Sequence, residues 1–250
     1  MLGPQRVLSL CTSVTDTMLR LGQGARLAGI DEYSRAVPGA AHLPVLGKGS
    51  TISREEVLAR GIDLAFVWWY QEQAAQTLAD LRVPVVKVRC QRAREVPGVI
   101  RLVGAKLGCT NQAEALAQSA AARLACLESV CHTNAPRVYV ELYSPFKTIG
   151  RDSYLNDLIE LAGGRNIAAD VAGSVLLSSE RLLAADPQVV VLFDGFSTAE
   201  QFARRSGMKS LSAVQNQRVH VIDRHCLVAG AGFGDGVAVL SKLFRPPAHR

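Results

Sequence analysis

The stretch SREEVLARGIDLAF at residues 53–66 is similar to a later stretch, SSERLLAADPQVVV, at residues 178–191. The matched positions are Ser53 with Ser178, Glu55 with Glu180, Leu58 with Leu183, and Ala59 with Ala184. A serine at the start of a helix accepts a hydrogen bond from the first turn, where an acidic side chain also complements the helix dipole. Each copy therefore predicts a short, serine-capped helix that leads into a buried strand.

Strand-sized runs rich in Val, Leu and Ile recur along the rest of the chain, between segments with apolar residues at helical spacing. These runs are residues 6–10, 27–30, 64–67, 85–88, 137–140, 189–192 and 219–222. Strands that alternate with helices form mainly parallel sheets that are covered on both faces. The sequence thus predicts an α/β fold, and the internal repeat predicts two Rossmann-like lobes.

Between the two halves, residues 111–130 read NQAEALAQSAAARLACLESV and contain neither Gly nor Pro. These residue types are strong helix formers, and a helix of this length is about 30 Å long. Breaks at Pro97-Gly98 and at HTNAP, residues 132–136, flank the segment. We therefore expect an N-terminal lobe at 1–108, one long bridging helix at 109–134 and a C-terminal lobe at 135–250.

The composition excludes several classes of protein. With 48% hydrophobic and 20% charged residues, the 250-residue chain is neither disordered nor fibrous. Its longest apolar runs are far shorter than the roughly 20 residues of a membrane-spanning helix. The net charge of +6 comes from scattered basic residues, so no nucleic-acid partner is expected. The first residues, MLGPQRVLSL, lack the features of a signal peptide, so either a leader was removed or the protein stays inside the cell.

Neither the cysteines nor the known catalytic motifs indicate an enzyme. The cysteines form no C-x-x-C pair, which argues against a zinc site, and Cys109 and Cys126 lie in a helical stretch where buried free thiols are expected. The motifs G-x-S-x-G, H-E-x-x-H, the P-loop and a dinucleotide-binding G-x-G-x-x-G after a strand are all missing. We expect no catalytic residues and no cofactor.

Three longer segments resemble a known family, the helical-backbone (class III) substrate-binding proteins of ABC importers for vitamin B12, haem and iron–siderophore complexes. These segments are RVLSLCTSVTDTMLRLGQGARLAGID at 6–31, LPVLGKGSTISREEVLARGIDLAFVW at 43–68 and SPFKTIGRDSYLNDLIELAGGRNIAAD at 144–170. They occur in the family's order, and the likeness covers about residues 5–244. The resemblance implies a monomeric, periplasmic or lipid-anchored binding protein that works with an ABC permease and its ATPase.

In α/β sheets, ligands bind outside the carboxyl ends of the strands, so two facing lobes are expected to form a cleft lined by strand-end loops. On one wall we expect Thr12, Ser13, Tyr33, Trp68, Trp69, Tyr70 and Arg89, beside Cys11. On the other wall we expect Tyr143, Phe146, Arg151, Phe196, Arg224 and His225, beside Cys226.

Among these residues, the aromatic triplet Trp68-Trp69-Tyr70 is the strongest indication of a ligand, because both tryptophans of the chain directly follow a buried strand. Such rings stack on a large flat or apolar ligand. The resemblance places Trp68 where a vitamin B12-binding relative has a pocket tryptophan, so Trp68 is the preferred ligand-facing ring. One of the two indoles is expected to pack into its own lobe.

Two further residues have competing interpretations. Arg151, ahead of a helix, either binds a carboxylate or phosphate or is an ordinary surface arginine. His225, with Cys226 and the glycine-rich segment 230–236, either reaches a metal centre on a flexible loop or is a hydrogen-bonded structural residue. The sequence therefore assigns no metal ligands.

The resemblance gives the repeat-matched Glu55 and Glu180 a role as the pair that docks on permease arginines; helix-dipole complementarity is the simpler interpretation. A corrinoid is the first choice of ligand, with a ferric siderophore or haem next. Many haem-binding members have a tyrosine in the loop that here reads Gly47-Lys-Gly-Ser-Thr51, although Tyr33 or Tyr143 remain as iron ligands. The alternatives are a molybdate-type oxyanion-binding protein and an intracellular metal-chelate sensor or enzyme.

Overall fold

The computed structural model describes residues 3–245 and divides them into two compact units. Unit 1 comprises the described residues up to Cys90 together with Arg94–Leu124 and Val228–Gly232. Unit 2 comprises Gln91–Ala93, Ala125–Leu227 and the described residues from Phe233 onward. Each unit therefore includes a short segment that lies, in sequence, within the other half, which the expected division at residues 108 and 135 does not include.

Unit 1 is built on a sheet with the strand order β4-β3-β2-β1-β5-β6. The strands are β1 (Val7–Ser9), β2 (Leu27–Asp31), β3 (Val45–Lys48), β4 (Thr51–Ile52), β5 (Leu64–Trp68) and β6 (Val85–Val88). All neighbours pair in parallel except β3 and β4, which form an antiparallel pair. The predicted strands of the first half are confirmed. The short β3–β4 pair was not predicted, because its sequence contains no strand-sized apolar run.

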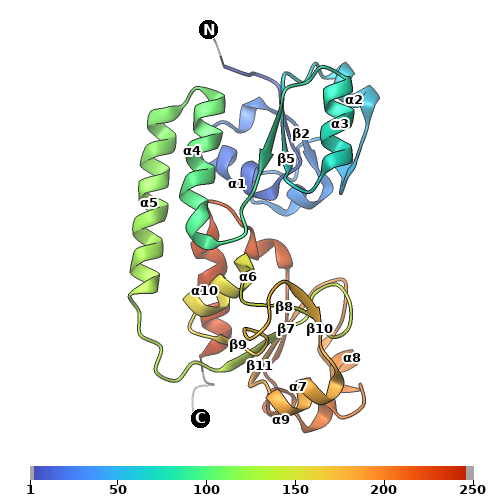
Figure 1. Ribbon diagram of the computed structural model, residues 1–250, viewed down its shortest axis with the longest axis vertical. Helices are drawn as coiled ribbons and strands as arrows, with labels where there is room; N and C mark the ends of the chain where they lie inside the picture. Colours follow the sequence, from blue (N-terminus) through green and yellow to red (C-terminus); the bar gives the residue numbers. More distant parts are fainter. Residues whose placement is uncertain (1–2, 246–250) are drawn as a thin grey trace. The chain divides into compact units, whose positions relative to one another are not determined.

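Helices cover both faces of this sheet (Figure 1). They are α1 (Thr12–Arg20), α2 (Arg54–Ala59), α3 (Glu72–Asp80), α4 (Val96–Leu107) and α5 (Thr110–Glu128), with 3-10 turns at Gly24–Arg26, Glu32–Ala36 and Ala93–Glu95. Side chains alternate between the faces of a strand. Leu8 and Val67 accordingly share one core with Val57 of α2 and Leu78 of α3.

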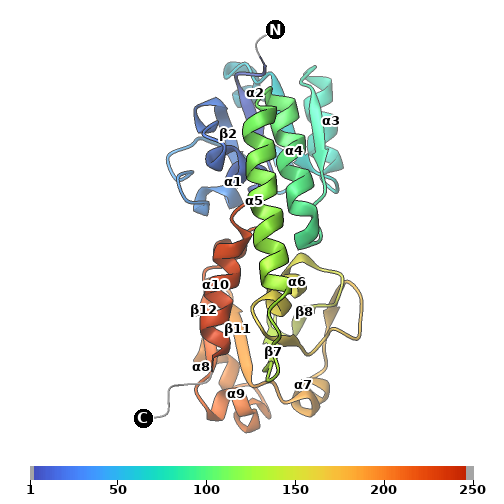
Figure 2. The same cartoon turned by 90° about the vertical axis from the view of Figure 1, so that its left-hand side faces the viewer.

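The long helix expected at residues 111–130 is confirmed as α5, and it packs against α4. A Cβ added to Gly104 of α4 would lie 2.0 Å from the Cβ of Ala113, so the two helix backbones approach closely. The two helices run side by side in Figures 1 and 2. The buried residues of α5 are almost all alanine, at Ala113, Ala117 and Ala120, because a close contact leaves no room for larger side chains. No helix among residues 3–245 has both the length and the apolar character needed to cross a bilayer.

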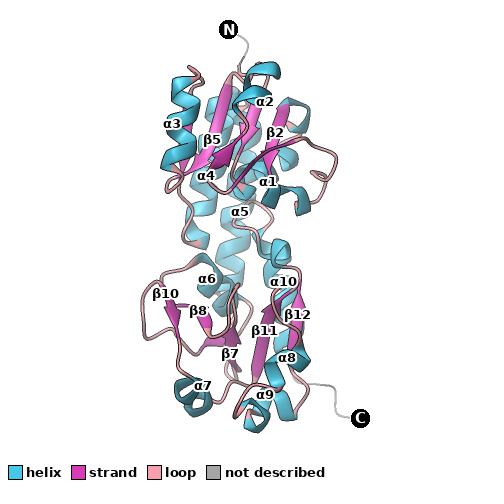
Figure 3. Cartoon of the chain, turned by 90° about the vertical axis from the view of Figure 1, so that its right-hand side faces the viewer, coloured by secondary structure: helices cyan, strands magenta, loops and turns pink. Residues whose placement is uncertain are grey.

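Unit 2 repeats the strand order of unit 1. Its parallel sheet has the order β12-β11-β7-β9, and β8 and β10 form a separate antiparallel pair beside it (Figure 3). The strands are β7 (Arg137–Val140), β8 (Lys147–Ile149), β9 (Arg165–Asn166), β10 (Ser174–Leu176), β11 (Val189–Phe193) and β12 (Val219–Ile222). In chain order, β7, β9, β11 and β12 take the places of β1, β2, β5 and β6, which supports a duplicated lobe.

The helices of unit 2 also lie on both faces of its sheet. They are α6 (Tyr154–Leu161), α7 (Ser179–Ala185), α8 (Ala199–Ala203), α9 (Ser212–Gln215) and α10 (Phe233–Phe244), with 3-10 turns at Met208–Ser210 and Arg224–Leu227. Tyr139, Val190 and Leu192 form a core with Leu182 and Phe202. On the opposite face, α6 and α10 meet at Gly164, where an added Cβ would contact Phe244, Val138 and Ile159.

Candidate functional site

In unit 1, several of the predicted binding residues follow neighbouring strands at one edge of the sheet. Tyr33 comes after β2, Trp68, Trp69 and Tyr70 end or follow β5, and Arg89 follows β6. Because β2, β1, β5 and β6 are parallel neighbours, their carboxyl ends lie along the same edge. Tyr33 and Tyr70 are 37% and 60% exposed, and both tryptophans are half-buried. The fold therefore brings these side chains together on one surface.

The rings of Trp68, Trp69 and Tyr70, called here the aromatic cluster, pack against one another. The Trp68 and Tyr70 rings are nearly parallel, at 6° with 6.4 Å between centroids. Trp69 stands at 86° to both of them, at 6.0 Å from Trp68 and 4.9 Å from Tyr70. The Arg89 guanidinium lies 6.0 Å from the centroid of Trp69, in cation–π range. The cluster thus combines aromatic surface with one positive charge.

A buried glutamine holds the backbone of the aromatic cluster in place. Gln71 is 2% exposed, and its side-chain oxygen accepts a 2.8 Å hydrogen bond from the Trp68 amide. Its side-chain nitrogen donates a 2.7 Å bond to the carbonyl of Gly49, in the β3–β4 turn. Sequence reasoning missed Gln71, although its place directly after the aromatic triplet was visible. Gln71 thus joins the aromatic loop to the β3–β4 turn.

Burial raises the pKa values of three groups, Cys11, Tyr70 and Asp31. Burial and the nearby Asp31 raise the pKa of the Cys11 thiol well above its usual value. Burial, with smaller contributions from Cys11 and Asp31, likewise raises the pKa of Tyr70. The pKa of Asp31 is itself raised by burial, although its carboxylate accepts hydrogen bonds from the amide and hydroxyl of Ser34. This surface therefore favours ring stacking and neutral hydrogen bonding around the cation of Arg89.

The Thr12 and Ser13 pair is only partly at this surface. The predicted loop is absent, because Cys11 is the N-cap of α1 and Thr12 already begins the helix. Thr12 is half-buried, but Ser13 is fully buried, and its hydroxyl has no hydrogen-bond partner among the described residues. Ser13 is the second residue of α1 and is completely buried, so the structure contradicts the expectation that it lines a surface.

In unit 2, the predicted residues Tyr143, Phe196, Arg224 and His225 follow β7, β11 and β12, three adjacent parallel strands. Tyr143 and Phe196 are 59% and 46% exposed. The Arg224 guanidinium lies 5.9 Å from the centroid of Phe196. His225 Nδ1 is 2.6 Å from the Asp223 carboxylate, which also accepts a 2.9 Å bond from the His225 amide. These contacts fit the interpretation of His225 as a hydrogen-bonded structural residue.

Two predicted residues of unit 2 are engaged elsewhere. Phe146 is half-buried against the unit 2 core, with a positive φ of 62°. Its amide donates a 2.9 Å hydrogen bond to Glu141 Oε2, and its place on a binding surface stays a prediction. Arg151 is exposed, and its Nη1 donates a 2.7 Å bond to the Asp170 carbonyl, which is the ordinary structural interpretation.

The loop after β7 is anchored by a buried ion pair that the sequence did not reveal. Glu141 is 2% exposed and accepts bonds of 2.6 and 2.8 Å from the Arg205 guanidinium. The Tyr139 hydroxyl, at 3.1 Å, adds a further donor to this carboxylate. The same guanidinium lies 5.5 Å from the ring centroid of Phe146 and 5.1 Å from that of Phe202. Glu141 and Arg205 are distant in sequence, so only the fold pairs them.

Two buried aspartates bind the two segments that each unit takes from the other half of the sequence, Val228–Gly232 in unit 1 and Gln91–Ala93 in unit 2. Asp16 of α1 accepts a 2.8 Å bond from the Gly232 amide and a 2.9 Å bond from Arg20. An added Cβ on Gly230 would lie 2.6 Å from Asp16 Oδ2, so the expected flexible glycine loop is in fact closely packed. Asp157 of α6 binds the Arg92 guanidinium at 2.6 Å and the Ala93 amide at 2.7 Å. Each aspartate thus anchors the segment that comes from the other half of the sequence.

Glu55 and Glu180 occupy equivalent places in the two units. Ser53 and Ser178 accept hydrogen bonds from the amides of Glu56 and Arg181, so both predicted serine caps are confirmed. Glu55 and Glu180 are exposed in the first turns of α2 and α7. Hydrogen bonds from its own amide and from the Ser178 and Ser179 hydroxyls lower the pKa of Glu180, so it is ionised at neutral pH. Both helices therefore present a carboxylate to solvent.

The structure assigns no metal site to these residues. Among residues 3–245, no group of three or more His, Cys, Asp or Glu side chains is arranged to hold a metal ion. No disulfide joins any of the cysteines in the described residues: Cys11, Cys90 and Cys109 are buried, Cys226 is half-buried, and Cys126 and Cys131 are exposed. The expectation of a buried thiol at Cys126 is wrong, because that residue lies on the outward face of α5.

Comparisons with known proteins identify a common family and a common fold. A family model described as periplasmic binding protein matches residues 7–225. YvrC of Bacillus subtilis, an uncharacterized ABC transporter substrate-binding lipoprotein, is 25% identical over 263 residues, which cover 99% of this chain and 82% of YvrC. A cobalamin-binding protein of Halobacterium salinarum is 29% identical over 221 residues, covering 84% of this chain but 59% of that protein. A periplasmic haem-binding protein of Pseudomonas aeruginosa has a similar crystal structure, with TM-score 0.84, 26% identity and coverage of 98% and 94% of the two chains.

Proposed function

Because the chain belongs to the periplasmic binding protein family, we propose that it is the substrate-binding component of an ABC importer and that it captures a metal–organic complex, with a corrinoid as first choice. The observation that carries the choice of ligand is the aromatic cluster at the carboxyl edge of the unit 1 sheet. Aromatic side chains supply large contact areas with little loss of conformational freedom. A flat macrocycle is the kind of ligand that uses such a surface.

The electrostatic character of the same surface also supports a corrinoid. Cys11 and Tyr70 have raised pKa values and are uncharged at neutral pH, and Arg89 is stacked on Trp69. A corrinoid carries neutral amide arms and one phosphate, which suit neutral hydrogen-bonding groups and a single cation. The cobalamin-binding relative is in line with this choice.

Haem or a ferric siderophore is the second candidate, and exposed tyrosines favour it. Tyr33 and Tyr143, each at a strand end, are 37% and 59% exposed, and tyrosine is a known ligand of haem iron. The similarity to a haem-binding protein supports the same possibility. The β3–β4 turn contains no tyrosine, which places haem after a corrinoid.

A spectroscopic titration separates these ligands. We expect cyanocobalamin to quench the tryptophan fluorescence of the purified protein at a one-to-one endpoint, because both indoles lie in the aromatic cluster. Haem, a ferric hydroxamate and molybdate are titrated in parallel, with absorbance recorded for the coloured ligands. A new Soret band with haem, together with no response to cyanocobalamin, would reassign the ligand. Tight binding of molybdate alone would support an oxyanion-binding protein.

The carboxylates of Glu55 and Glu180 are proposed to contact the permease. Replacing both by glutamine should leave ligand affinity within about twofold of the unmodified protein, because neither residue is among the strand-end residues of the proposed ligand surface. Uptake by cells that express the permease and ATPase should fall by about tenfold or more, since two charge pairs are lost. The matched control is Glu72→Gln with Glu200→Gln, which removes one exposed carboxylate from each unit. Normal uptake by the Glu55/Glu180 double variant would refute the docking role.

The family and the lipoprotein relative support a place outside the cytoplasm, with attachment to the membrane through a lipid anchor. Delivery of a captured ligand to a permease requires no chemical change of that ligand. The proposal therefore assigns binding and docking roles to the residues above, and no catalytic role.

A further inference from the structure

The two most exposed large apolar side chains among residues 3–245 are leucines near the proposed docking glutamates. Leu176 is 67% exposed and Leu58 is 62% exposed. Leu58 follows Glu55 by three positions in α2, which puts the two side chains on the same face of the helix. Leu176 ends β10, four positions before Glu180 in the first turn of α7. Each unit therefore has one strongly exposed leucine within four residues of its proposed docking carboxylate.

On α2, the charged side chains other than Glu55 are paired within unit 1. Arg54 lies 3.7 Å from the Asp80 carboxylate, and Glu56 lies 2.7 Å from the guanidinium of Arg60. Glu55 forms no ion pair within residues 3–245. Among the charges of this helix, the carboxylate of Glu55 is the one that has no partner in its own unit.

The charges of α7 are arranged in the same way. Its basic residue, Arg181, contacts the Asp170 carboxylate at 2.6 Å. Glu180 accepts a 3.0 Å hydrogen bond from the Ser179 hydroxyl, but it has no basic partner in the described part of the chain. A hydrogen bond from a hydroxyl leaves the negative charge of a carboxylate in place. Both units thus combine an acidic side chain that lacks a counter-ion with a nearby exposed leucine.

The two leucines come from different positions of the internal repeat. Leu58 is matched by Leu183, which is half-buried against the unit 2 core, and a Cβ added to Gly207 would lie 2.9 Å from its Cδ1. Leu176, two positions before the serine cap, is matched by Thr51. A duplication alone would place both exposed leucines at the same position. The feature that the units share is therefore the combination of leucine and carboxylate.

Scattered exposed leucines are common on protein surfaces, so the distribution of the exposed side chains decides their meaning. After the two leucines, the most exposed large apolar side chains are Tyr70 and Tyr143, at 60% and 59%, which belong to the proposed ligand surface. The next, Val130, is only 49% exposed. Each unit thus has one strongly exposed tyrosine on the ligand surface and one strongly exposed leucine near its docking glutamate.

We propose that Leu58 and Leu176 are docking residues that pack into apolar depressions of the permease, each beside the basic group that receives Glu55 or Glu180. The proposal rests on the docking role proposed above for the two glutamates, and it adds an apolar part to the same contact. A leucine that leaves water at an interface adds affinity, whereas exposed charge pairs act mainly on orientation and on the rate of encounter. Because the combination occurs once in each unit, the permease is expected to offer two like receiving surfaces.

The test measures binding of the protein to the permease and ATPase of its importer, held together in lipid nanodiscs, at about 50 and 500 mM salt. Leu58→Ser and Leu176→Ser should each weaken binding by about tenfold at both salt concentrations, because salt does not screen an apolar contact. The Glu55→Gln, Glu180→Gln double variant should lose affinity mainly at the lower concentration. The melting temperatures of the leucine variants should stay near that of the unmodified protein, since both side chains lie largely in solvent.

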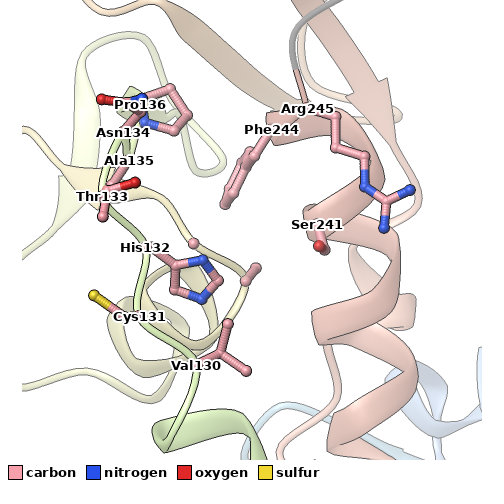
Figure 4. A pocket seen from close by; sticks show the side chains of 12 residues that line it. Val130, Cys131, His132, Thr133, Asn134, Ala135, Pro136, Ser241, Phe244 and Arg245 are labelled. Atoms are coloured by element: carbon pink, nitrogen blue, oxygen red, sulfur yellow. The ribbon is translucent and has the colours of Figure 1, made fainter.

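The matched control is Val130→Ser, which removes another exposed apolar side chain from unit 2. Figure 4 shows Val130 on the wall of a cavity formed by residues 130–136 and the end of α10, outside α7 and the strand before it. This change should leave binding to the permease unaltered at both salt concentrations. A loss as large as that of the leucine variants would show a general dependence on exposed apolar surface and would overturn the proposal.

The other outcomes separate the apolar contact from the docking role itself. Unchanged binding in both leucine variants, together with a salt-dependent loss in the glutamate variant, would overturn the apolar contact and retain the docking role. No binding by the unmodified protein, or no loss in any variant, would refute the docking role and the apolar contact together. Dimers of the free protein in sedimentation that Leu58→Ser or Leu176→Ser dissociates would assign these leucines to a contact between copies, which also overturns the proposal.

Discussion

Replacement of Arg205 by methionine is expected to lower the free energy of unfolding of unit 2 by about 3–5 kcal/mol, the usual cost of leaving a buried charge without its partner. Glu141 is 2% exposed, and two of its hydrogen bonds, of 2.6 and 2.8 Å, come from the Arg205 guanidinium. Methionine preserves most of the packing against Phe146 and Phe202 but offers no donor. The carboxylate must then be protonated or pull water into the core.

Chemical denaturation followed by circular dichroism measures this change. Arg204→Met is the matched control, because it makes the same substitution one residue earlier at an 80% exposed side chain, where we expect a change below about 0.5 kcal/mol. Adding Glu141→Leu to Arg205→Met should recover much of the loss, since the double variant no longer buries a lone charge. A single variant as stable as its control would show that the ion pair is not a structural anchor.

Replacement of Trp68 by alanine is expected to weaken binding of the preferred ligand by about 30-fold or more, which corresponds to about 2 kcal/mol. An aromatic residue at the centre of a contact surface commonly accounts for that much binding free energy. Trp68 is half-buried at the end of β5, and its ring is nearly parallel to that of Tyr70. Only a small decrease in melting temperature should accompany the loss of affinity, because Trp68 is not fully buried in the core.

The comparison variant is Trp69→Ala, which removes the other indole of the same loop. Trp69 stands perpendicular to its neighbours and carries Arg89 on its ring, so its loss should reduce affinity less than the loss of Trp68. Isothermal titration with cyanocobalamin and thermal unfolding are measured for both variants. If Trp68→Ala unfolds far below the unmodified protein while its affinity per folded molecule is retained, Trp68 is a structural residue. A larger affinity loss in Trp69→Ala would make Trp69 the ligand-facing ring.

Much of the fold was predictable because its signals are local. The strands at 64–67 and 189–192 are apolar runs, and the serine caps before α2 and α7 need only residues three positions apart. The aromatic triplet after β5 was predictable for a related reason: parallel strands end at a common edge, so residues that follow them share a surface. Glu141 and Arg205 were not predictable, because a charged residue in a sequence does not reveal which distant partner will neutralise it.

The sequence by itself determined the α/β class, the repeated serine-capped helix with its following strand, the long alanine-rich helix and the aromatic triplet at the end of β5. Each of these depends on residues close together in the chain or on a repeated pattern. Only the tertiary structure decided that Ser13 is fully buried, that Glu141 pairs with Arg205, and that Asp16 and Asp157 bind segments from the other half of the sequence. Those outcomes depend on which distant backbone amides and side chains meet when the sheets close, and local spacing contains no information about such contacts.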